Sequence, residues 1–334
     1  IQFKTDTDTE VLINFIEMCI NESKNIDKGL SFALSRVEGA YGIVIINTKN
    51  PELIYAARRG SPLAFGKIND DFIIASDPRP IVEYTKKIIY LDNNQILKIT
   101  NNNFEILDLD LNKINKNFEY VDLEIEKAEI GDYDSFMLKE IMEQPSSIKQ
   151  SMLGRVKDNN ITLGGINKYV NNLIKCRRII LIGCGTSYHA GLVIEYFFEK
   201  YLKIPVEVEY ASEFRYRNPI LSEDDIVFVI SQSGETADSL EATRIAKQKG
   251  AIVLGIVNVV GSSIARETYE GCYLHAGPEI AVASTKAFPS QLIVMFMIGI
   301  KIGFLKKTIS EKKYKKMIKE ISMLPEKIEE ILSF

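Results

Sequence analysis

The chain has 334 residues, of which 46% are hydrophobic and 26% are charged, so it can bury a sizeable core in two domains or more. Its formal net charge of −4 excludes an overall cationic field that would attract nucleic acids or anionic membrane surfaces. A small molecule is therefore the expected partner, and we expect neither nucleic-acid nor membrane binding.

The apolar runs and the cysteines exclude two further classes of protein. The longest apolar run, LIVMFMIGI at 292–300, is well below the ~18 residues of a membrane span and predicts a core helix. The cysteines at 19, 176, 184 and 272 have neither the spacing of a zinc site nor the density of a disulfide scaffold. We expect no bound metal and a reducing, cytoplasmic environment.

Residues 1–120 have the pattern of an α+β domain. From Thr9 to Arg36 the apolar residues recur every three or four positions, which predicts two helices. Six short β-branched runs follow between residues 41 and 100, separated by Asn, Asp, Gly and Pro, and they predict antiparallel strands. Because the chain begins with neither Met nor a signal peptide, we expect residue 1 to lie inside a longer protein.

Residues 121–175 are predicted to be a linker followed by connecting helices. The stretch EIEKAEIGDYD at 124–134 is charged and irregular, as linkers are. The stretch from 136 to 153 is amphipathic, and Pro145 within it is expected to break or restart the helix.

Residues 176–305 alternate between apolar strands and helices, which predicts a doubly wound parallel α/β domain. Ligands of such domains bind beyond the carboxyl ends of the strands. The lysine-rich stretch 306–320 is interpreted as the solvated face of an amphipathic helix around Ile309, Tyr314, Met317 and Ile318, and 306–334 as a helical connection to a further module. The alternative is a site for an acidic partner. The chain stops within this helical pattern, so we expect it to be a fragment at this end too.

One turn of the α/β domain, VISQSGETADSL at 229–240, is rich in hydroxyl groups. Ser231, Ser233 and Thr236 add donors to the N–H groups of a helix start, Gly234 permits close backbone approach, and Gln232 adds an amide. This combination suits a phosphate, with Thr236 expected on the first helical turn. The alternative is an ordinary N-cap by Ser233.

Two further turns of the domain have the same character. LIGCGTSYHAG at 181–191 supplies Thr186 and Ser187, and AVASTKAF at 281–288 supplies Ser284. Three such turns in one domain can converge on one ligand. Neither the dinucleotide fingerprint nor the phosphate-binding loop with G-x-x-x-x-G-K-[ST] spacing occurs, so we expect no cofactor.

Four residues near these turns have competing interpretations. Cys184 could be a nucleophile, but no partnered base is evident, which favours a small buried thiol. His189 could be an acid or base, although a packing or surface role is favoured. Lys286 either compensates phosphate charge or caps a helix start, and Glu235 is expected to face outward and complement a helix dipole.

Several motifs carry a family resemblance. In order, GCGTSYHAG, ASEFRYR, SQSGETADSL, NVVGSSIARE and ASTKAF resemble the first sugar isomerase (SIS) module of the glutamine:fructose-6-phosphate aminotransferase family. Upstream, TDTDTEV, EGAYGIVIIN, ARRGSPLAFG, IASDPRPIVEYT and KEIMEQPSSIKQSMLGR resemble the later half of its N-terminal-nucleophile (Ntn) type glutaminase domain and the connection to the SIS modules. The resemblance covers almost the whole chain.

The resemblance implies an enzyme that forms glucosamine 6-phosphate and glutamate from fructose 6-phosphate and glutamine. It implies phosphate contacts in the turn at 231–236, sugar contacts from the other two turns including the backbone of Val282, and an Asp8 carboxylate that holds the α-amino group of glutamine. Without the resemblance, Asp8 is a helix cap or dipole partner. The implied substrate-binding residues, for fructose 6-phosphate or glucose 6-phosphate, are Thr186, Ser187, Ser231, Gln232, Ser233, Thr236, Val282 and Ser284.

The family's catalytic groups are not found in this sequence. Its cysteine nucleophile belongs before Ile1, and its acid/base residues and Schiff-base lysine belong to a second SIS module after Phe334, so we expect no catalytic residue in this chain and no complete reaction from it alone. SIS modules of the family pair, which implies a homo-oligomer. The alternative is a non-catalytic SIS-domain regulator, which the glutaminase-like upstream half disfavours.

Overall fold

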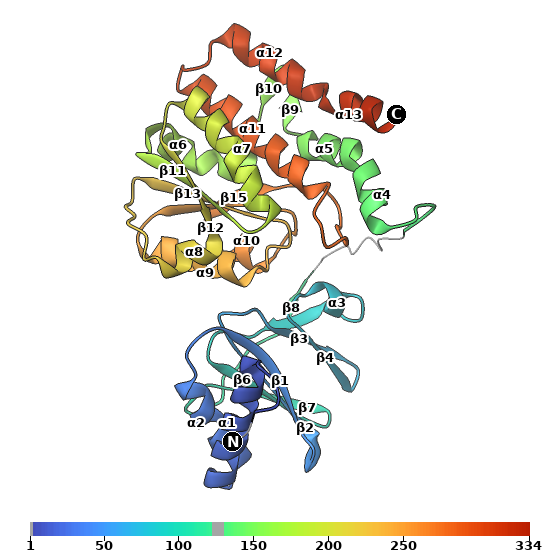
Figure 1. The fold of residues 1–334 in the computed structure, drawn as a ribbon, viewed down its shortest axis with the longest axis vertical. Coiled ribbons are helices and arrows are strands. Elements are labelled where there is room, and N and C mark those ends of the chain that lie inside the picture. Colours follow the sequence, from blue (N-terminus) through green and yellow to red (C-terminus); the bar gives the residue numbers. More distant parts are fainter. Residues whose placement is uncertain (1–2, 122–129) are drawn as a thin grey trace. The chain divides into compact units, whose positions relative to one another are not determined.

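The computed structural model describes residues 3–121 and 130–334, which form two compact units (Figure 1). The predicted linker at 124–134 falls largely on 122–129, outside the described residues. The division into domains at 120, 175 and 305 stays a prediction.

Among residues 3–121, the first unit has two long helices, a third helix of four residues and two antiparallel sheets. Both predicted helices and all six predicted strands are confirmed, and two short strands, β7 and β8, had no clear signal in the sequence. One sheet has the order β1-β2-β6-β7 and the other β4-β3-β5-β8. The elements are α1 (Asp8–Ser23), α2 (Ile26–Arg36), β1 (Tyr41–Asn47), β2 (Asn50–Arg59), β3 (Ala64–Ile68), β4 (Asp71–Ala75), α3 (Arg79–Val82), β5 (Lys87–Tyr90), β6 (Gln95–Thr100), β7 (Asn103–Leu107) and β8 (Glu119–Tyr120).

The period of the strands explains the layers of this unit. Successive side chains of a strand point to opposite faces. In β2, Tyr55 and Ala57 therefore pack with the helices, whereas Ala56 between them packs with Phe65 of the second sheet. The unit is thus a layer of helices on one sheet, with the second sheet on its other face.

The second unit contains a parallel sheet between helices. Pro145 lies in the first turn of α5, so the predicted break between two helices is confirmed. The elements before the sheet are α4 (Phe136–Met142), α5 (Gln144–Met152), β9 (Val156–Lys157), β10 (Asn160–Ile161), a 3-10 helix (Gly164–Tyr169) and α6 (Val170–Lys175). The sheet and its helices are β11 (Arg178–Gly183), α7 (Thr186–Leu202), β12 (Val206–Tyr210), α8 (Ala211–Tyr216), β13 (Asp225–Ser231), α9 (Ala237–Gln248), β14 (Ile252–Val257), α10 (Ser263–Glu267), β15 (Glu270–Tyr273), α11 (Ala287–Leu305), α12 (Glu311–Ser322) and α13 (Leu324–Leu332).

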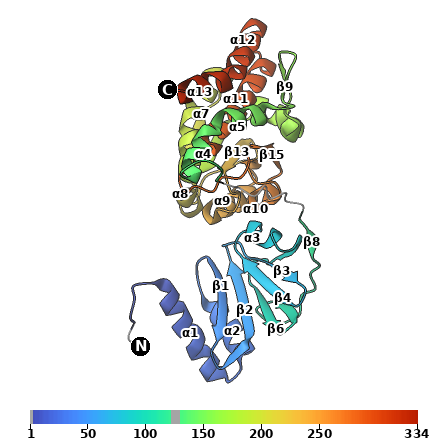
Figure 2. The ribbon, with the colours of Figure 1, turned by 90° about the vertical axis from the view of Figure 1, so that its right-hand side faces the viewer.

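All strands of this sheet are parallel, in the order β12-β11-β13-β14-β15, which confirms the predicted parallel α/β arrangement. Alternate side chains of β11 separate the two cores: Ile179 and Leu181 face α7 and α11, and Ile180 and Ile182 face α8 and α9. Figure 2 shows these helix pairs on opposite faces of the sheet. Both faces are covered, as expected for a parallel sheet.

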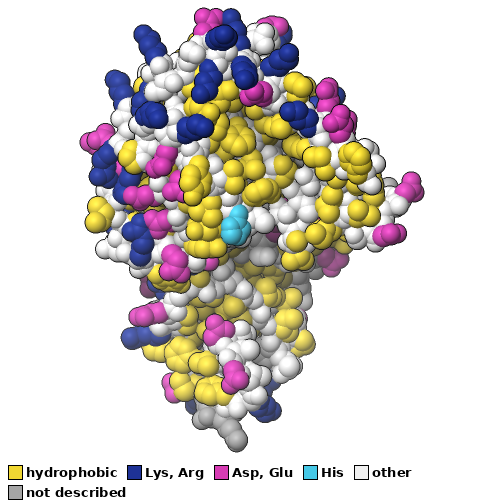
Figure 3. Space-filling view, turned by 45° about the horizontal axis from the view of Figure 1, so that its top comes forward, with side chains coloured by type: hydrophobic (Ala, Val, Ile, Leu, Met, Phe, Trp, Pro, Cys, Tyr) yellow, Lys and Arg dark blue, Asp and Glu magenta, His cyan; other side chains and the backbone are white. Residues whose placement is uncertain are grey.

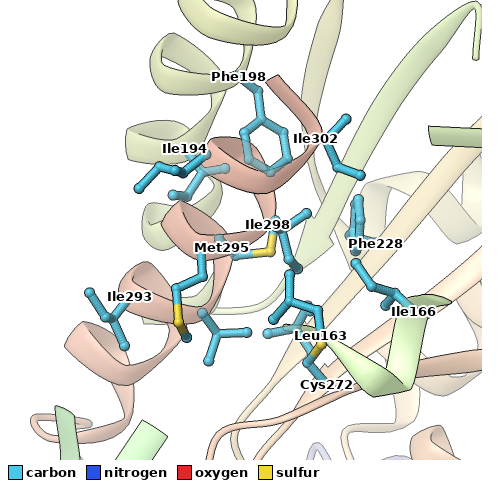
Figure 4. Packing of buried hydrophobic residues seen from close by; sticks show 14 of the residues in the cluster. Leu163, Ile166, Ile194, Phe198, Phe228, Cys272, Ile293, Met295, Ile298 and Ile302 are labelled. Atoms are coloured by element: carbon cyan, nitrogen blue, oxygen red, sulfur yellow. The ribbon is translucent and has the colours of Figure 1, made fainter. Parts of the chain in front are cut away.

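Helix α11 is the centre of the larger core. Figure 4 shows its Met295, Ile298 and Ile302 beside Phe198 of α7 and Phe228 of β13. The helix is long and apolar enough to cross a membrane by length and composition, but 61% of its apolar window is buried inside the unit. The predicted core helix at 292–300 is therefore confirmed.

Helix α12 confirms the predicted amphipathic pattern of the C-terminal stretch. Ile309, Tyr314, Met317 and Ile318 are all buried. The lysines of the same segment lie on its outer face, where Lys315 pairs with Glu311 along the helix. Such exposed ion pairs add little stability. The buried apolar face of α12 therefore holds the helix against the rest of the unit.

A buried carboxylate, Asp225, lies at the amino edge of the parallel sheet and is paired with two arginines. The Asp225 carboxylate accepts hydrogen bonds from Arg177 Nη2 at 2.9 Å, Arg178 Nε at 3.2 Å and the Ser222 N–H at 2.9 Å. Burial raises the pKa of Asp225, but the bonds from Arg177, Arg178 and Ser222 outweigh it, so its pKa lies below the ordinary value.

This lowered pKa predicts acid sensitivity. A carboxylate whose pKa is lower in the folded chain adds stability that is present above its unfolded pKa, near about 4, and is lost as the pH falls below it. We expect Asp225→Asn to lower the free energy of unfolding by about 2–3 kcal/mol at pH 7 and by less at pH 3. Urea unfolding at both pH values checks this, and an equal difference at the two pH values would contradict it.

Candidate functional site

The strand order predicts where in the sheet a ligand site lies, namely between β11 and β13. From β11 the chain continues to β12 on one side, and from β12 it returns to β13 on the other, so the order reverses between β11 and β13. Gly183 and Ile230, near the ends of these strands, are paired in register. The turns that follow them therefore begin side by side at the carboxyl edge, where doubly wound sheets bind ligands.

The first turn brings the start of α7 close to β11. A side chain at Gly183 would come within 2.8 Å of the backbone of Ser187, so glycine permits this tight approach. Thr186 is the first residue of α7 and is half-buried, and Ser187 is buried. The Ser187 hydroxyl oxygen accepts a hydrogen bond from Gln291 Nε2 of α11 at 2.9 Å, which joins the first turn to the helix after the third.

The second turn is held by its own serines. Ser231 Oγ accepts from the Gly234 N–H at 3.0 Å, and Ser233 Oγ accepts from the Glu235 N–H at 3.2 Å. Thr236 was predicted to lie on the first turn of the helix. Helix α9 begins at Ala237, however, so Thr236 is its N-cap and the prediction is wrong by one position. The reason is the left-handed backbone of Gly234, at φ +69°, which extends the turn before the helix starts. The alternative, in which Ser233 is the N-cap of the helix, is wrong. Its hydroxyl oxygen accepts from the Glu235 N–H inside the turn, and the N-cap is Thr236.

The third turn connects β15 to α11 and is held by a buried carboxylate. Glu279 Oε1 accepts from the Thr285 N–H at 2.8 Å and from the Ala287 N–H at 3.1 Å. Asn258, just after β14, binds the start of the same segment, since its Nδ2 donates to the Gly277 carbonyl at 2.7 Å. Ser284 lies half-buried in this turn, and Val282 is fully exposed.

Several buried polar atoms around these turns have no hydrogen-bond partner among residues 3–121 and 130–334. Buried polar groups are ordinarily paired, so a group of such atoms marks a place where water or a ligand completes the bonding. The atoms are Gln232 Nε2, Ser262 Oγ, Ser284 Oγ, Thr285 Oγ1 and Gln291 Oε1.

The charges beside the second turn are neutralised internally. Asp238, in the first turn of α9, would oppose a bound anion, but Arg215 Nη1 lies 2.7 Å from its Oδ1. Glu235 was expected to face outward, yet it is half-buried and its Oε1 accepts from the Ser263 N–H at 2.8 Å, at the start of α10. Glu235 therefore complements the dipole of α10, and not that of α9, the helix that follows it in the chain.

The remaining three candidates can now be placed. Cys184 is half-buried, and burial raises the pKa of its thiol, which makes it a weaker nucleophile at neutral pH. His189 is exposed and its ring lies 5.5 Å from that of Tyr188. Lys286 is only 4% exposed, and its Nζ lies 2.6 Å from Glu143 Oε2, so its charge is paired within the chain.

Asp8 lies in the other unit, as the first residue of α1, and is exposed. A neighbouring carboxylate that the sequence analysis did not single out holds this stretch: Glu10 accepts from the N–H groups of Lys4 at 2.9 Å and Thr5 at 2.7 Å. The Thr5 hydroxyl and these N–H groups lower the pKa of Glu10. The hydrogen bonds of Glu10 order the start of α1, and Asp8 lies exposed beside it.

Residues 172–301, which include all three turns, match the SIS domain family. Over 99% of its length the chain is 47% identical to a protein of Chlorobaculum tepidum, and 45% identical to one of Bacteroides thetaiotaomicron, both named glutamine–fructose-6-phosphate aminotransferase (isomerizing). The chain is a homologue of these aminotransferases. It spans about half the length of these relatives, 54% in each case.

A solved structure agrees with the SIS domain match. The C-terminal domain of glucosamine-fructose-6-phosphate aminotransferase from Francisella tularensis is 38% identical, with a TM-score of 0.57, over 59% of this chain and 56% of that one. The resemblance to this aminotransferase family is thus confirmed, and the parallel sheet with its three turns lies in the part that matches the SIS domain family, whereas the Ntn-type glutaminase fold of the first unit stays a prediction.

The backbone of Gly234 gives a test of the second turn. Both Gly234 and Gly250 have positive φ, but a side chain at Gly234 would come within 2.0 Å of Ser262 Oγ, whereas none of the described atoms lies within 4 Å at Gly250. We expect Gly250→Ala to lower the free energy of unfolding by about 1 kcal/mol, and Gly234→Ala by about 2–3 kcal/mol. Chemical denaturation measures both. Equal losses would show that Ser262 moves freely and that the turn is not tightly built.

Proposed function

We propose that this chain supplies the sugar-phosphate site of an enzyme that transfers the amide nitrogen of glutamine to fructose 6-phosphate and forms glucosamine 6-phosphate and glutamate. The homology over 99% of the chain supports this family-level activity. The observation that carries the assignment is the meeting of two turns with hydroxyl side chains at the point where the strand order reverses.

The hydrogen bonds of three serines define what the site can do. Ser187, Ser231 and Ser233 each accept a hydrogen bond through the hydroxyl oxygen, so the hydroxyl hydrogen is not used in that bond. A hydroxyl has one donor and two acceptor positions. Each serine can therefore donate to a ligand oxygen, as a phosphate or a sugar hydroxyl requires.

Roles within the site follow from position. Ser231, Gln232, Ser233 and Thr236 surround the start of α9, a 12-residue helix whose positive dipole end favours an anion, and we assign them to the phosphate. Thr186 and Ser187 of the first turn and Ser284 with the backbone of Val282 in the third are assigned to the hydroxyls of fructose 6-phosphate or glucose 6-phosphate. No cofactor enters this proposal.

The first unit is assigned to the glutaminase. Its two antiparallel sheets under a layer of helices are compatible with the later part of an Ntn-type glutaminase domain. Asp8, exposed at the start of α1, is then the carboxylate for the α-amino group of glutamine. The second candidate, a regulatory SIS-domain protein without chemistry, does not account for this unit. The four cysteines are free thiols, so we place the protein in the reducing cytoplasm.

Binding is the direct test of the site. We expect fructose 6-phosphate to bind the chain weakly, and we expect a Ser231→Ala/Ser233→Ala variant to lose at least about tenfold in affinity, because two donors to a charged phosphate are removed. Isothermal calorimetry measures both. Thr308→Ala, which removes a hydroxyl three residues after the end of α11, is the control. Equal affinity of the double variant and the wild type would remove the assignment.

A second surface of the SIS domain supports assembly. A hollow of about 530 Å³ lies between α7, α11 and α12. Val193, Tyr196, Phe197 and Phe296 line it, and Tyr196 is 75% exposed. Figure 3 shows hydrophobic side chains gathered on this unit with lysine and arginine side chains beside them. Apolar surface of this kind marks protein contacts, and we assign it to a second copy of the domain.

This assignment predicts a dimer or larger species. Tyr196→Ser removes a large exposed aromatic side chain, and such residues dominate the energy of interfaces. We expect the wild type to associate at tens of micromolar in analytical ultracentrifugation and the variant to associate at least about tenfold more weakly. Tyr216→Ser, which changes another exposed tyrosine outside the hollow, should behave as the wild type. A monomeric wild type would contradict the assignment.

A further inference from the structure

The third turn of the SIS domain is fastened by a helix that precedes the sheet. This turn, residues 279–287, carries Ser284 and Val282. Within the turn, the Glu279 carboxylate accepts hydrogen bonds from the N–H groups of Thr285 and Ala287 and so stabilises its second half. The first half, at Ile280 and Ala281, is bound from elsewhere in the chain.

That binding group is Glu140 of α4. Its Oε1 accepts from the Ile280 N–H at 2.6 Å and from the Ala281 N–H at 3.2 Å, across a separation of about 140 residues. The Glu140 side chain is 2% exposed. Its other oxygen, Oε2, is buried with no hydrogen-bond partner in the described parts of the chain. A carboxylate in this position is costly to bury, so fold stability alone gives it little reason to be there.

A second contact fastens the other end of the same turn. Glu143, one helical turn after Glu140, accepts from Lys286 Nζ at 2.6 Å. Lys286 is the N-cap of α11 and directly follows the turn's hydroxyl residues. Residues 140 and 143 therefore hold the turn from 280 to 286 at both ends, and the sugar-facing residues lie between the two attachments.

We propose that Glu140 is a positioning residue that fixes the turn at 279–287 so that Ser284 and the Val282 backbone meet the sugar. This inference rests on the proposed function for its effect on sugar binding. The phosphate turn at 231–236 is held by its own serines, so Glu140 acts on the sugar part of the ligand and not on the phosphate part.

The experiment compares three variants of the full chain. Glu140→Leu removes both acceptors while keeping a buried side chain of similar size, and Glu140→Gln keeps an oxygen that can accept from Ile280 and Ala281. Glu199→Leu is the matched control, because Glu199 Oε1 also accepts from a backbone N–H, that of Val206, at the far end of α7. Urea unfolding of each variant verifies that it folds.

The first measurement needs no ligand. Hydrogen–deuterium exchange at the amides of Ile280 and Ala281 should accelerate at least about tenfold in Glu140→Leu and return toward wild type in Glu140→Gln, since a lost bond to a charged acceptor frees these amides. The strands β11 and β13 should keep their protection. Unchanged exchange at the two amides would overturn the proposal, and so would equal acceleration in Glu199→Leu.

The second measurement separates sugar from phosphate. By calorimetry, Glu140→Leu should bind fructose 6-phosphate about tenfold more weakly than wild type, with its affinity for inorganic phosphate within about twofold. Glu140→Gln should recover most of the sugar-phosphate affinity. Equal losses for both ligands would overturn the proposal, since they would indicate general damage. A wild type that binds neither ligand would overturn the proposed function, and the exchange measurement would still decide whether Glu140 fastens the turn.

Discussion

Parallel strands cannot be joined by tight turns, and this restriction organises the whole SIS domain. Each connection must leave the carboxyl edge of the sheet, pass through a helix over one face and return to the amino edge. The turns after β11 and β13 therefore open on the same edge although 48 residues separate Gly183 from Ser231. The hydroxyl groups of both turns follow from their place in this arrangement, because a strand end followed by a helix start supplies backbone donors that small side chains can extend.

The electrostatics of the site depend on the same helix starts. Two cations beside the turns are paired with carboxylates of the chain, Arg215 with Asp238 and Lys286 with Glu143. An anion bound at the second turn, as proposed above, would meet hydroxyl groups, backbone N–H groups and the dipole of α9. Neutral donors that are held in place by their own hydrogen bonds need little rearrangement when a ligand binds. Unlike lysine or arginine side chains, they add no positive charge to the empty site.

The sequence predicted what depends on local pattern. The strands and helices of the SIS domain, the core role of α11 and the turns with Ser187, Ser231 and Ser284 all follow from the order of apolar and hydroxyl residues. The family motifs added the roles that the pattern left open. Thr236 was placed one position wrongly because the backbone of Gly234 decides where α9 begins, and element boundaries depend on such single dihedral angles.

Long-range contacts leave no local pattern in the sequence. Glu140 belongs to an amphipathic helix whose pattern gives no sign that one carboxylate turns inward to Ile280, and Gln291 lies in an almost entirely apolar helix where a polar residue has no local explanation. The β8 strand was missed because two residues are too short to show a period, and β7 gave a weak signal because Glu105 interrupts its apolar residues.

The composition of α11 also has a consequence for the order of folding during synthesis. Helices α8, α9 and α10, which cover one face of the sheet, are complete by residue 267, whereas α11, which covers much of the other face, spans 287–305. When β15 of a nascent chain has just left the ribosome, one face of the sheet is therefore finished, whereas the other is covered by α7 but not yet by α11, and part of its apolar surface, which includes Leu254, still meets water. Such surfaces attract chaperones or other unfinished chains, so the interval before α11 emerges is the period in which this domain is most prone to aggregate.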